Sequence, residues 1–314
     1  MKQLLLLLCF EVGCMGLINA QPPTITSFTP ANARPGDAVT IAGNNFNSTA
    51  ANNVVFFGAT RATVTAATAT SLTVTVPSGA TYAHITLLNT GTGLTCASLS
   101  NFNPVYSPPK TSIGSNDFDA NVEFVTGSNT RPSSVAIGDL DGDGKPDLAV
   151  VNSSTAANTI SVFRNTATSG SITAASFAAQ VDFATGSGPQ QVAIGDIDGD
   201  GKPELVVANQ GGSTVSVFRN TAVIGSITAA SFAPKADFAA GGRPFSVAIG
   251  DIDGDGKPDL AVANQFSDNV SILLNTSATG NISFAAKADF ATGDSPQSVA
   301  IGDIDGDGKP DVAT

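Results

Sequence analysis

Short runs of alternating apolar and polar residues, separated by turn residues, follow one another along most of the chain after residue 20. No long segment has apolar residues at helical spacing, so the pattern predicts β-strands joined by turns. Between residues 22 and 104 the runs recur at about ten-residue intervals, which is typical of a β-sandwich. They read TITSFTP, AVTIAG, NVVFFG, RATVTAA, SLTVTVP and AHITLLNT. The pattern therefore predicts an all-β protein that begins with a sandwich domain.

From residue 118 onward the chain repeats itself. The clearest marker is a turn rich in Asp and Gly, whose first aspartates are separated by 57, 55 and 52 residues. Each turn follows a VAIGD-like strand and precedes an apolar strand such as LAVAN, and about four short strands fit in each unit. This is typical of a β-propeller blade rather than of a helical repeat. Three units are complete and a fourth stops at Thr314, so we expect a partial propeller that is a fragment of a longer one.

The first 20 residues have the layout of a secretory signal peptide. Lys2 precedes an apolar run from Leu4 to Phe10, and Ala20 offers a small residue before the expected cleavage. The run is far shorter than the roughly 18 apolar residues of a membrane-spanning helix. We therefore expect a secreted or cell-surface protein with no transmembrane segment after the signal peptide.

The expected organisation has four parts. A signal peptide at 1–20 is followed by the sandwich at 21–104, and the repeats occupy 118–314. Between them, residues 105–117 carry prolines and polar residues, which predict a linker.

The repeated turn has the spacing of a calcium loop. Counted from its first Asp, it has carboxylates at positions 1, 3, 5 and 9, glycine at 6 and lysine at 7. Alternate residues converge when a chain wraps round a point, glycine permits the sharp bend, and position 7 can offer its carbonyl. Oxygen ligands in a flexible loop favour Ca²⁺ over Zn²⁺ and Mg²⁺. The spacing thus predicts about one Ca²⁺ per loop.

Two other interpretations of the turn are open. An EF-hand needs a glutamate at position 12 and flanking helices, but the flanks here are β-rich and position 12 is Val or Thr in every copy. An acidic turn without metal is the other, because Asp and Gly favour turns for local hydrogen-bonding reasons. Against it, two like charges about 4 Å apart repel by roughly 4 kcal/mol at an effective dielectric near 20.

The charge balance agrees with a metal-binding protein. The four turns hold 16 of the 26 acidic residues, and four Ca²⁺ would bring the formal charge from −12 to −4. The missing basic face argues against a nucleic-acid partner. With no Trp, two Tyr and one His, neither a sugar-stacking platform nor a general base stands out, so we assign no catalytic or organic-cofactor residues and expect no enzyme activity.

Two resemblances to known families sharpen these expectations. The opening P-x-I-x-S-F-x-P, the P-G-D-x-V-T-I-x-G of Pro35–Gly43, Phe57–Gly58 and the T-V-x-V-P of Thr73–Pro77 resemble the IPT/TIG family of immunoglobulin-like domains. The acidic turns between VAIGD and DLAVAN strands over residues 118–314 resemble the FG-GAP/VCBS repeat family. The first resemblance implies a spacer or interaction module, and the second implies an integrin-α-like β-propeller with Ca²⁺ in its loops.

The second resemblance also implies a ligand set. The implied carboxylates are Asp139, Asp141, Asp143 and Asp147, Asp196, Asp198, Asp200 and Glu204, Asp251, Asp253, Asp255 and Asp259, and Asp303, Asp305, Asp307 and Asp311. The implied carbonyls are those of Lys145, Lys202, Lys257 and Lys309.

By family analogy we expect a secreted, calcium-binding, non-enzymatic adhesion or interaction protein whose partner is an extracellular protein or glycan. The alternative is the N-terminal accessory region of a secreted enzyme, such as a polysaccharide lyase, with its catalytic part outside this sequence.

Overall fold

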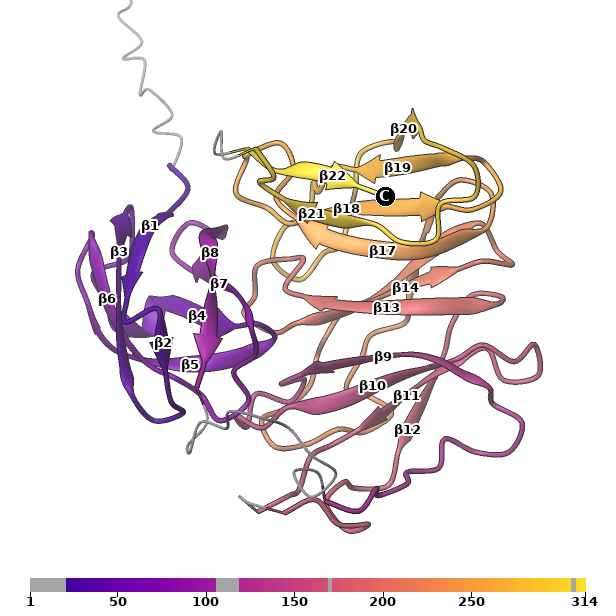
Figure 1. Cartoon of the computed structure of the whole chain (residues 1–314), viewed down its shortest axis with the longest axis horizontal. Coiled ribbons are helices and arrows are strands. Elements are labelled where there is room, and N and C mark those ends of the chain that lie inside the picture. The colour runs from indigo at the N-terminus through magenta and orange to yellow at the C-terminus, as the bar shows by residue number, and fades with distance from the viewer. Residues whose placement is uncertain (1–20, 106–118, 169–170, 306–308) are drawn as a thin grey trace, which may run out of the picture.

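The structure is a computed structural model that describes residues 21–105, 119–168, 171–305 and 309–314 (Figure 1). Its regular elements are β-strands and one short 3-10 helix, η1 (Ala50–Asn52), which confirms the predicted all-β class. The predicted signal peptide and all but the first residue of the predicted linker lie outside the described residues. Within the described residues, no helix is long and apolar enough to cross a membrane.

The N-terminal domain is an immunoglobulin-like sandwich. Its strands are β1 (Thr24–Thr29), β2 (Asn32–Ala33), β3 (Ala38–Asn44), β4 (Asn53–Phe57), β5 (Thr60–Ala67), β6 (Ser71–Thr75), β7 (Ala83–Asn89) and β8 (Leu94–Pro104). They pair in the order β1-β3-β6-β5-β4-β7-β8-β2, and the sheet folds over so that β1 contacts β8. The six predicted strands are confirmed, whereas β2 and the long β8 had no clear alternating pattern and were not predicted.

Side-chain alternation builds the core of the sandwich. Successive residues of a strand point to opposite faces, so Ile41 of β3 and Val55 and Phe57 of β4 point to the same interior. There the ring of Phe57 packs edge-on against that of Phe102 from β8, with 4.6 Å between the ring centroids. The unpredicted strand β8 therefore closes the core that the predicted strands begin.

The repeats form a series of small antiparallel sheets, as predicted for a partial propeller. The first contains β9 (Pro132–Gly138), β10 (Asp147–Asn152), β11 (Thr159–Phe163) and β12 (Val181–Ala184), and the second contains β13 (Pro189–Gly195), β14 (Glu204–Asn209), β15 (Thr214–Phe218) and β16 (Ala236–Ala239). The third contains β17 (Pro244–Gly250), β18 (Asp259–Asn264), β19 (Asn269–Leu273) and β20 (Ala288–Ala291), and a two-stranded sheet of β21 (Ala300–Gly302) and β22 (Asp311–Ala313) follows.

Each sheet packs face to face on the next, with a buried core between them. The glycine that ends each VAIGD-like strand makes this close approach possible. A Cβ built on Gly195 would lie 3.1 Å from the side chain of Ile249, which belongs to the next sheet. At the outer side, Phe183 and Phe232 pack edge to face with ring centroids 5.0 Å apart. The recurring Gly, Ile and Phe of the repeat are thus the contacts that stack one sheet on another.

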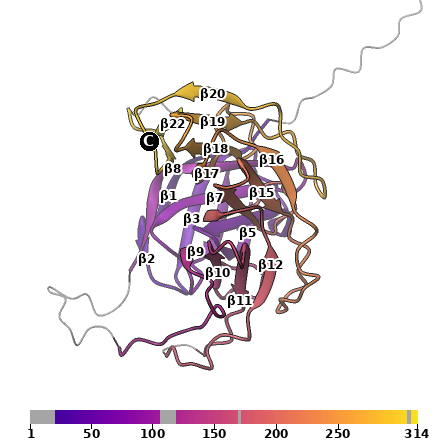
Figure 2. The ribbon, with the colours of Figure 1, turned by 90° about the vertical axis from the view of Figure 1, so that its right-hand side faces the viewer.

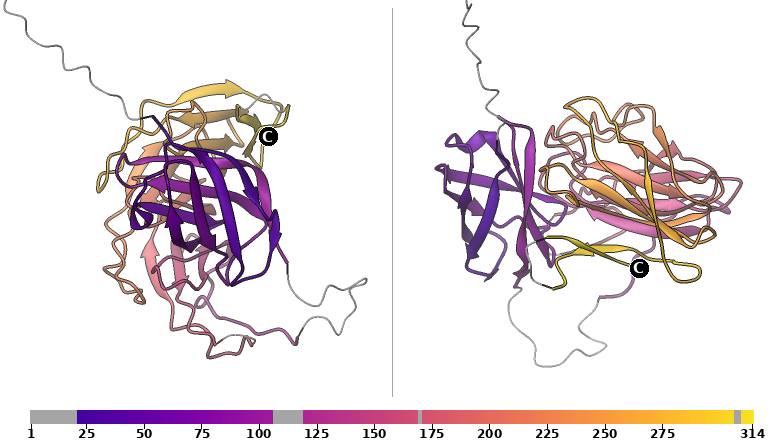
Figure 3. Two further views of the ribbon diagram at one scale, coloured as in Figure 1. Left: turned by 90° about the vertical axis from the view of Figure 1, so that its left-hand side faces the viewer. Right: turned by 90° about the horizontal axis from the view of Figure 1, so that it is seen from above.

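The sandwich lies beside the stack of sheets (Figures 1 and 3). In the view of Figure 2 it lies behind them. It contacts the stack at the ends of β9, β13 and β17, where the acidic turns begin. The first three predicted metal loops therefore sit at the boundary between the two domains.

Candidate metal centres

The four acidic turns occupy equivalent places in the repeats. We call them loop 1 (139–147), loop 2 (196–204), loop 3 (251–259) and loop 4 (303–311), and residues 306–308 of loop 4 are not described. Each loop joins the first strand of its sheet to the second. The sequence places glycine at positions 4 and 6, and both glycines in each of loops 1 to 3 have positive φ, between 70° and 85°. These left-handed turns let nine residues curl round one point.

A repeated set of hydrogen bonds shapes each of the first three loops. In loop 1, Asp139 Oδ2 accepts the N–H of Gly144 at 3.0 Å, and Asp141 Oδ1 accepts the N–H of Asp143 at 3.1 Å. Asp143 Oδ1 in turn accepts the N–H of Lys145 at 2.8 Å. The same bonds recur in loops 2 and 3 with nearly the same lengths. The carboxylates therefore order the loop backbone as well as facing its centre.

The loops bring three acidic side chains together in each case, with one carboxylate oxygen from each residue within 4.8 Å of the others. The groups are Asp139, Asp141 and Asp147, then Asp196, Asp198 and Glu204, then Asp251, Asp253 and Asp255, then Asp303, Asp305 and Asp311. Positions 1 and 3 belong to every group. The third member is position 9 in loops 1, 2 and 4, and position 5 in loop 3.

The remaining predicted ligands are placed differently. Asp143 and Asp200, at position 5, and Asp259, at position 9, are not in the groups that lie within 4.8 Å. Asp307 lies outside the described residues. The lysine side chains at position 7 point to the next hairpin where a contact is described: Lys202 Nζ donates to the carbonyl of Ala222 at 3.0 Å, and Lys257 Nζ to that of Ser277 at 3.1 Å. Metal binding by the lysine carbonyls of loops 1 to 4 stays a prediction.

The carboxylate at position 9 has a structural role that spacing alone did not reveal. Both oxygens of Glu204 accept backbone N–H groups, from Ile197 at 2.7 Å and from Asn220 at 3.1 Å. Asp147 and Asp259 make the equivalent pair of bonds. Position 9 therefore ties its own loop to the end of the third strand of its sheet.

Asn220 and Asn275 are further residues that the sequence analysis missed. The side chain of Asn220 donates to the carbonyls of Leu140, in loop 1, and Pro203, in loop 2, at 2.8 and 2.9 Å. Asn275 does the same one unit later, with the carbonyls of Ile197 and Pro258. The signal was present, because an asparagine recurs in VFRNT, VFRNT and LLNT. These asparagines join loops 1 and 2 to the following sheet.

Loop 1 contains the clearest indication of a cation-binding site. Asp139 and Asp141 are 1% and 3% exposed, and their oxygens Oδ1 and Oδ2, respectively, have no hydrogen-bond partner. A buried charge without a partner is strongly unfavourable, and two such oxygens in one loop repel one another. Carboxylate oxygens are the ligands that Ca²⁺ prefers, so the donor set fits this ion.

Burial and like charge raise the pKa values of the loop carboxyls. Burial is the largest cause, and it raises the pKa of Asp139 to about 6 and those of Asp147 and Asp196 to about 7. Neighbouring aspartates raise these values further, while backbone N–H groups of the loop lower them. Burial also raises the pKa of Asp259 to about 6 and that of Glu204 well above its ordinary value. Loops 1 to 3 thus gather acids that resist carrying their charges together unless a cation is present.

An immunoglobulin-like sandwich followed by propeller sheets with acidic loops defines the general class: a multidomain β-propeller repeat protein. The sequence pattern of the FG-GAP-like repeat matches residues 139–207, 196–262 and 251–314, and that of the IPT/TIG domain matches residues 23–117. The chain belongs to the FG-GAP-like repeat family and carries an IPT/TIG domain at its N-terminal side. Both resemblances seen in the sequence are confirmed, and both domain types are typical of extracellular proteins.

No curated protein matches the sequence. A Bacteroides thetaiotaomicron protein of unknown function is 14% identical with a TM-score of 0.33, over 89% of this chain and 64% of that chain. An auxiliary nutrient binding protein from Bacteroides ovatus is 12% identical with a TM-score of 0.27, over 89% of this chain and 93% of that chain. A rhamnogalacturonan lyase from Bacillus licheniformis is 12% identical with a TM-score of 0.39, over 94% of this chain and 57% of that chain. With TM-scores this low, the matches carry no argument about what this chain binds.

Proposed function

We propose that this protein is a secreted, non-enzymatic adhesion or interaction protein whose propeller sheets are braced by about one Ca²⁺ in each acidic loop. The observation that carries the proposal is the pair of buried, unpartnered oxygens in loop 1, Asp139 Oδ1 and Asp141 Oδ2. Buried charges are retained in proteins when they are paired or bind a metal. Acidic residues recur at the same positions in the other loops and lie together there as well, which supports one ion in each repeat.

The carboxylates at positions 1 and 3 are the common ligands in this proposal. Position 9 adds a third in loops 1, 2 and 4, and position 5 adds a third in loop 3. Lysine carbonyls and water complete a shell of the six to eight oxygens that Ca²⁺ takes. The ion supplies positive charge that offsets the repulsion among these acids and fixes the loop between its two strands.

The ions have a structural role, and recognition belongs to other surfaces of the two domains. Both oxygens of the position 9 carboxylates Asp147 and Glu204 accept hydrogen bonds from backbone N–H groups, which suits a structural role rather than a catalytic one. Domain types typical of extracellular proteins and the excess of acidic residues favour an extracellular protein or glycan as partner over nucleic acid. Extracellular calcium modules often bind with millimolar affinity, which matches loops 3 and 4, whose grouped acids are partly open to solvent.

Thermal unfolding of the full chain with and without chelator tests the calcium brace. We expect EGTA to lower the melting temperature, and excess Ca²⁺ to restore it, because only the ion-loaded loops balance their charge. Mg²⁺ at the same concentration should restore much less, since it prefers a smaller octahedral shell with more water. Identical melting curves in EGTA and in Ca²⁺ would contradict the proposal.

Binding of the purified chain to a panel of extracellular matrix proteins and polysaccharides tests the adhesion role. We expect at least one surface to retain the protein in Ca²⁺ and to release it in EGTA. Turnover of a polysaccharide by the same chain would instead show an enzyme.

A further inference from the structure

One outer face of the sandwich is buried although it points away from the sandwich core. Val54, Phe56 and Leu88 are 3%, 7% and 2% exposed and form a small cluster of their own. Because side chains alternate along a strand, Val54 and Phe56 of β4 point to the opposite side from the core residues of that strand. On an isolated sandwich this face would meet solvent. It is therefore covered by the other domain.

Loops 2 and 3 are the part of the propeller that covers it. A Cβ built on Gly201 would lie 3.3 Å from the side chain of Val54, and one on Gly199 would lie 3.6 Å from that of Leu88. In loop 3, a Cβ on Gly256 would lie 3.3 Å from the side chain of Leu94. These glycines stand at positions 4 and 6 of the acidic loops. The sandwich therefore rests directly on the backbone that curls round the predicted ion.

Hydrogen bonds across the boundary also end on the loops. In loop 3, the carbonyl of Gly256 accepts both the N–H and the Oγ1 hydroxyl of Thr95, at 2.5 and 2.7 Å. In loop 1, Asp139 donates its N–H to the carbonyl of Ala59 at 2.8 Å. The sandwich thus contacts all of the loops whose nine residues are described, and the hydrogen bonds it makes with loops 1 and 3 use their main chain.

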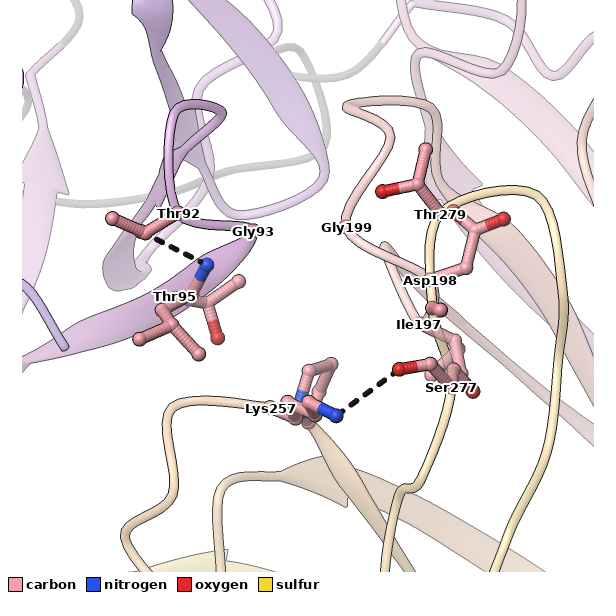
Figure 4. Close-up of a pocket in the computed structure, with 12 residues that line it drawn as sticks. Thr92, Gly93, Thr95, Ile197, Asp198, Gly199, Lys257, Ser277 and Thr279 are labelled. Atoms are coloured by element: carbon pink, nitrogen blue, oxygen red, sulfur yellow. Dashed lines mark hydrogen bonds between the residues drawn. The ribbon is translucent and has the colours of Figure 1, made fainter. Parts of the chain in front are cut away.

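The boundary is not tightly filled. A cavity of about 240 Å³ lies where the turn between β7 and β8 meets loops 2 and 3 (Figure 4). Thr92 and Thr95 line it from the sandwich, and Asp198 and Lys257 line it from the loops. Interfaces between domains of one chain are commonly small and polar, and relative motion of the domains is then expected.

We propose that the acidic loops and the sandwich form a metal-dependent joint, in which Ca²⁺ in loops 1 to 3 holds the sandwich against the propeller sheets and loss of the ion releases it. This inference rests on the calcium binding proposed above. The contacting groups are main-chain atoms of Asp139, Gly199, Gly201 and Gly256, and their positions depend on how the loop carboxylates are arranged. A loop that relaxes when its like charges are left unbalanced moves the surface on which the sandwich rests. Binding and docking are then linked, so each strengthens the other by the same factor.

Hydrogen exchange of the full chain in Ca²⁺ and in EGTA tests the joint, with calcium binding measured on the same sample by calorimetry. We expect EGTA to speed exchange of the Thr95 and Asp139 amides, whose hydrogen bonds cross the boundary, while the amide of Val39 in the sandwich core stays protected. Methyl NMR signals of Val54 and Leu88 should shift together with these amides.

Val54→Glu supplies the reciprocal test, with Leu99→Glu as the matched control, because Leu99 is 68% exposed on β8. We expect Val54→Glu to open the joint in Ca²⁺ and to weaken calcium binding on the order of fivefold, and Leu99→Glu to do neither. If Val54→Glu loses protection at Val39 and so fails to fold, Thr95→Val replaces it and should show the same direction with a smaller effect.

The outcomes separate the two proposals. Calcium binding with unchanged exchange at Thr95 and Asp139 in EGTA overturns the joint and leaves the calcium brace standing. Absence of calcium binding overturns both. Equal calcium affinity in Val54→Glu and Leu99→Glu, with both variants folded, also overturns the joint.

Discussion

Replacement of Asn220 by alanine is the sharpest test of how the acidic loops are tied into the fold. Its side chain is fully buried and makes three hydrogen bonds. It donates to the carbonyls of Leu140 and Pro203, and its Oδ1 accepts the N–H of Ala222. The change therefore removes the side-chain hydrogen bond from Asn220 to loop 1 without removing any charge or predicted ligand.

The expected cost follows from these bonds. A buried hydrogen bond contributes about 0.5–1.5 kcal/mol net, and a buried group left without its partner costs about 1–3 kcal/mol. Three hydrogen bonds are lost, and water can replace Asn220 as the partner of some of the groups left behind. The expected loss in the free energy of unfolding is therefore about 2–5 kcal/mol. For a domain of this size that corresponds to a fall in melting temperature of roughly 4–20 °C. Because the change touches no carboxylate, the fall should be similar in Ca²⁺ and in EGTA.

Thermal unfolding of Asn220→Ala beside Asn281→Ala measures the effect. Asn281 is exposed in the segment between β19 and β20 of the third sheet, and the described hydrogen bonds at this residue use its main chain, so its replacement should leave the melting temperature nearly unchanged. Melting temperatures for the two variants that agree would refute the claim that this asparagine fastens the loop to the next sheet.

Three further predictions concern the charges and the buried polar network. Asp141→Asn should weaken calcium binding, measured by titration calorimetry, by about tenfold or more. In EGTA its melting temperature should equal or exceed that of the wild type, because the change relieves repulsion among the loop carboxylates. The exposed control Asp294→Asn should change neither the calcium affinity nor the melting temperature. Burial raises the pKa of Asp139 to about 6 and that of Asp147 to about 7, so the metal-free folded state binds more protons than the unfolded chain between about pH 4 and 7. The stability of the metal-free protein should therefore fall as pH rises through this window, while the stabilisation by Ca²⁺ grows. Melting temperatures in EGTA and in Ca²⁺ should move apart across that range, and a constant difference between them would contradict the prediction. Ser216→Ala should cost about 1–3 kcal/mol in denaturant unfolding, because Asn209 and Asp237 both lose a buried partner, and a loss near zero would show that water replaces the hydroxyl.

The fold could be predicted from this sequence because its information is local and repeated. Alternation of apolar and polar residues in β3, β4 and β7 predicts the sandwich, and the recurring VAIGD and LAVAN strands predict the repeated sheets. The strand β8 was missed because its polar residues mask the period of two, and it is identified by its pairing with β7 and β2. Tertiary pairing can thus impose a strand where the pattern is weak.

The candidate site was predicted in outline and missed in detail. Spacing drew attention to positions 1 and 3, whose side chains lie together in every loop. It gave position 9 a single role, as a ligand, whereas both oxygens of Glu204 accept main-chain N–H groups. One of those groups belongs to Asn220, which lies sixteen residues further along the chain. Spacing within a loop does not reveal a partner that the sheet brings back from outside it.

The boundary between sandwich and loops also lay beyond the reach of the sequence. In the sequence, Val54 and Phe56 look like one face of a strand that is buried on both sides. The positive φ angles of the turns already explain the glycines of the acidic loops. Only the packing of the two domains shows that the same glycines admit the sandwich at close range. A residue that satisfies one local rule can therefore serve a second purpose that no local rule predicts.

The central claim is that divalent ions occupy the acidic loops, and metal binding by the full chain tests it most directly. The protein is stripped with chelator, dialysed against metal-free buffer and titrated with CaCl₂ at neutral pH, and bound metal is counted by elemental analysis after removal of the free ion. We expect about one Ca²⁺ per acidic loop, with release of protons from the loop carboxyls on binding. A protein that retains no calcium under these conditions, and melts at the same temperature with and without it, would contradict the account.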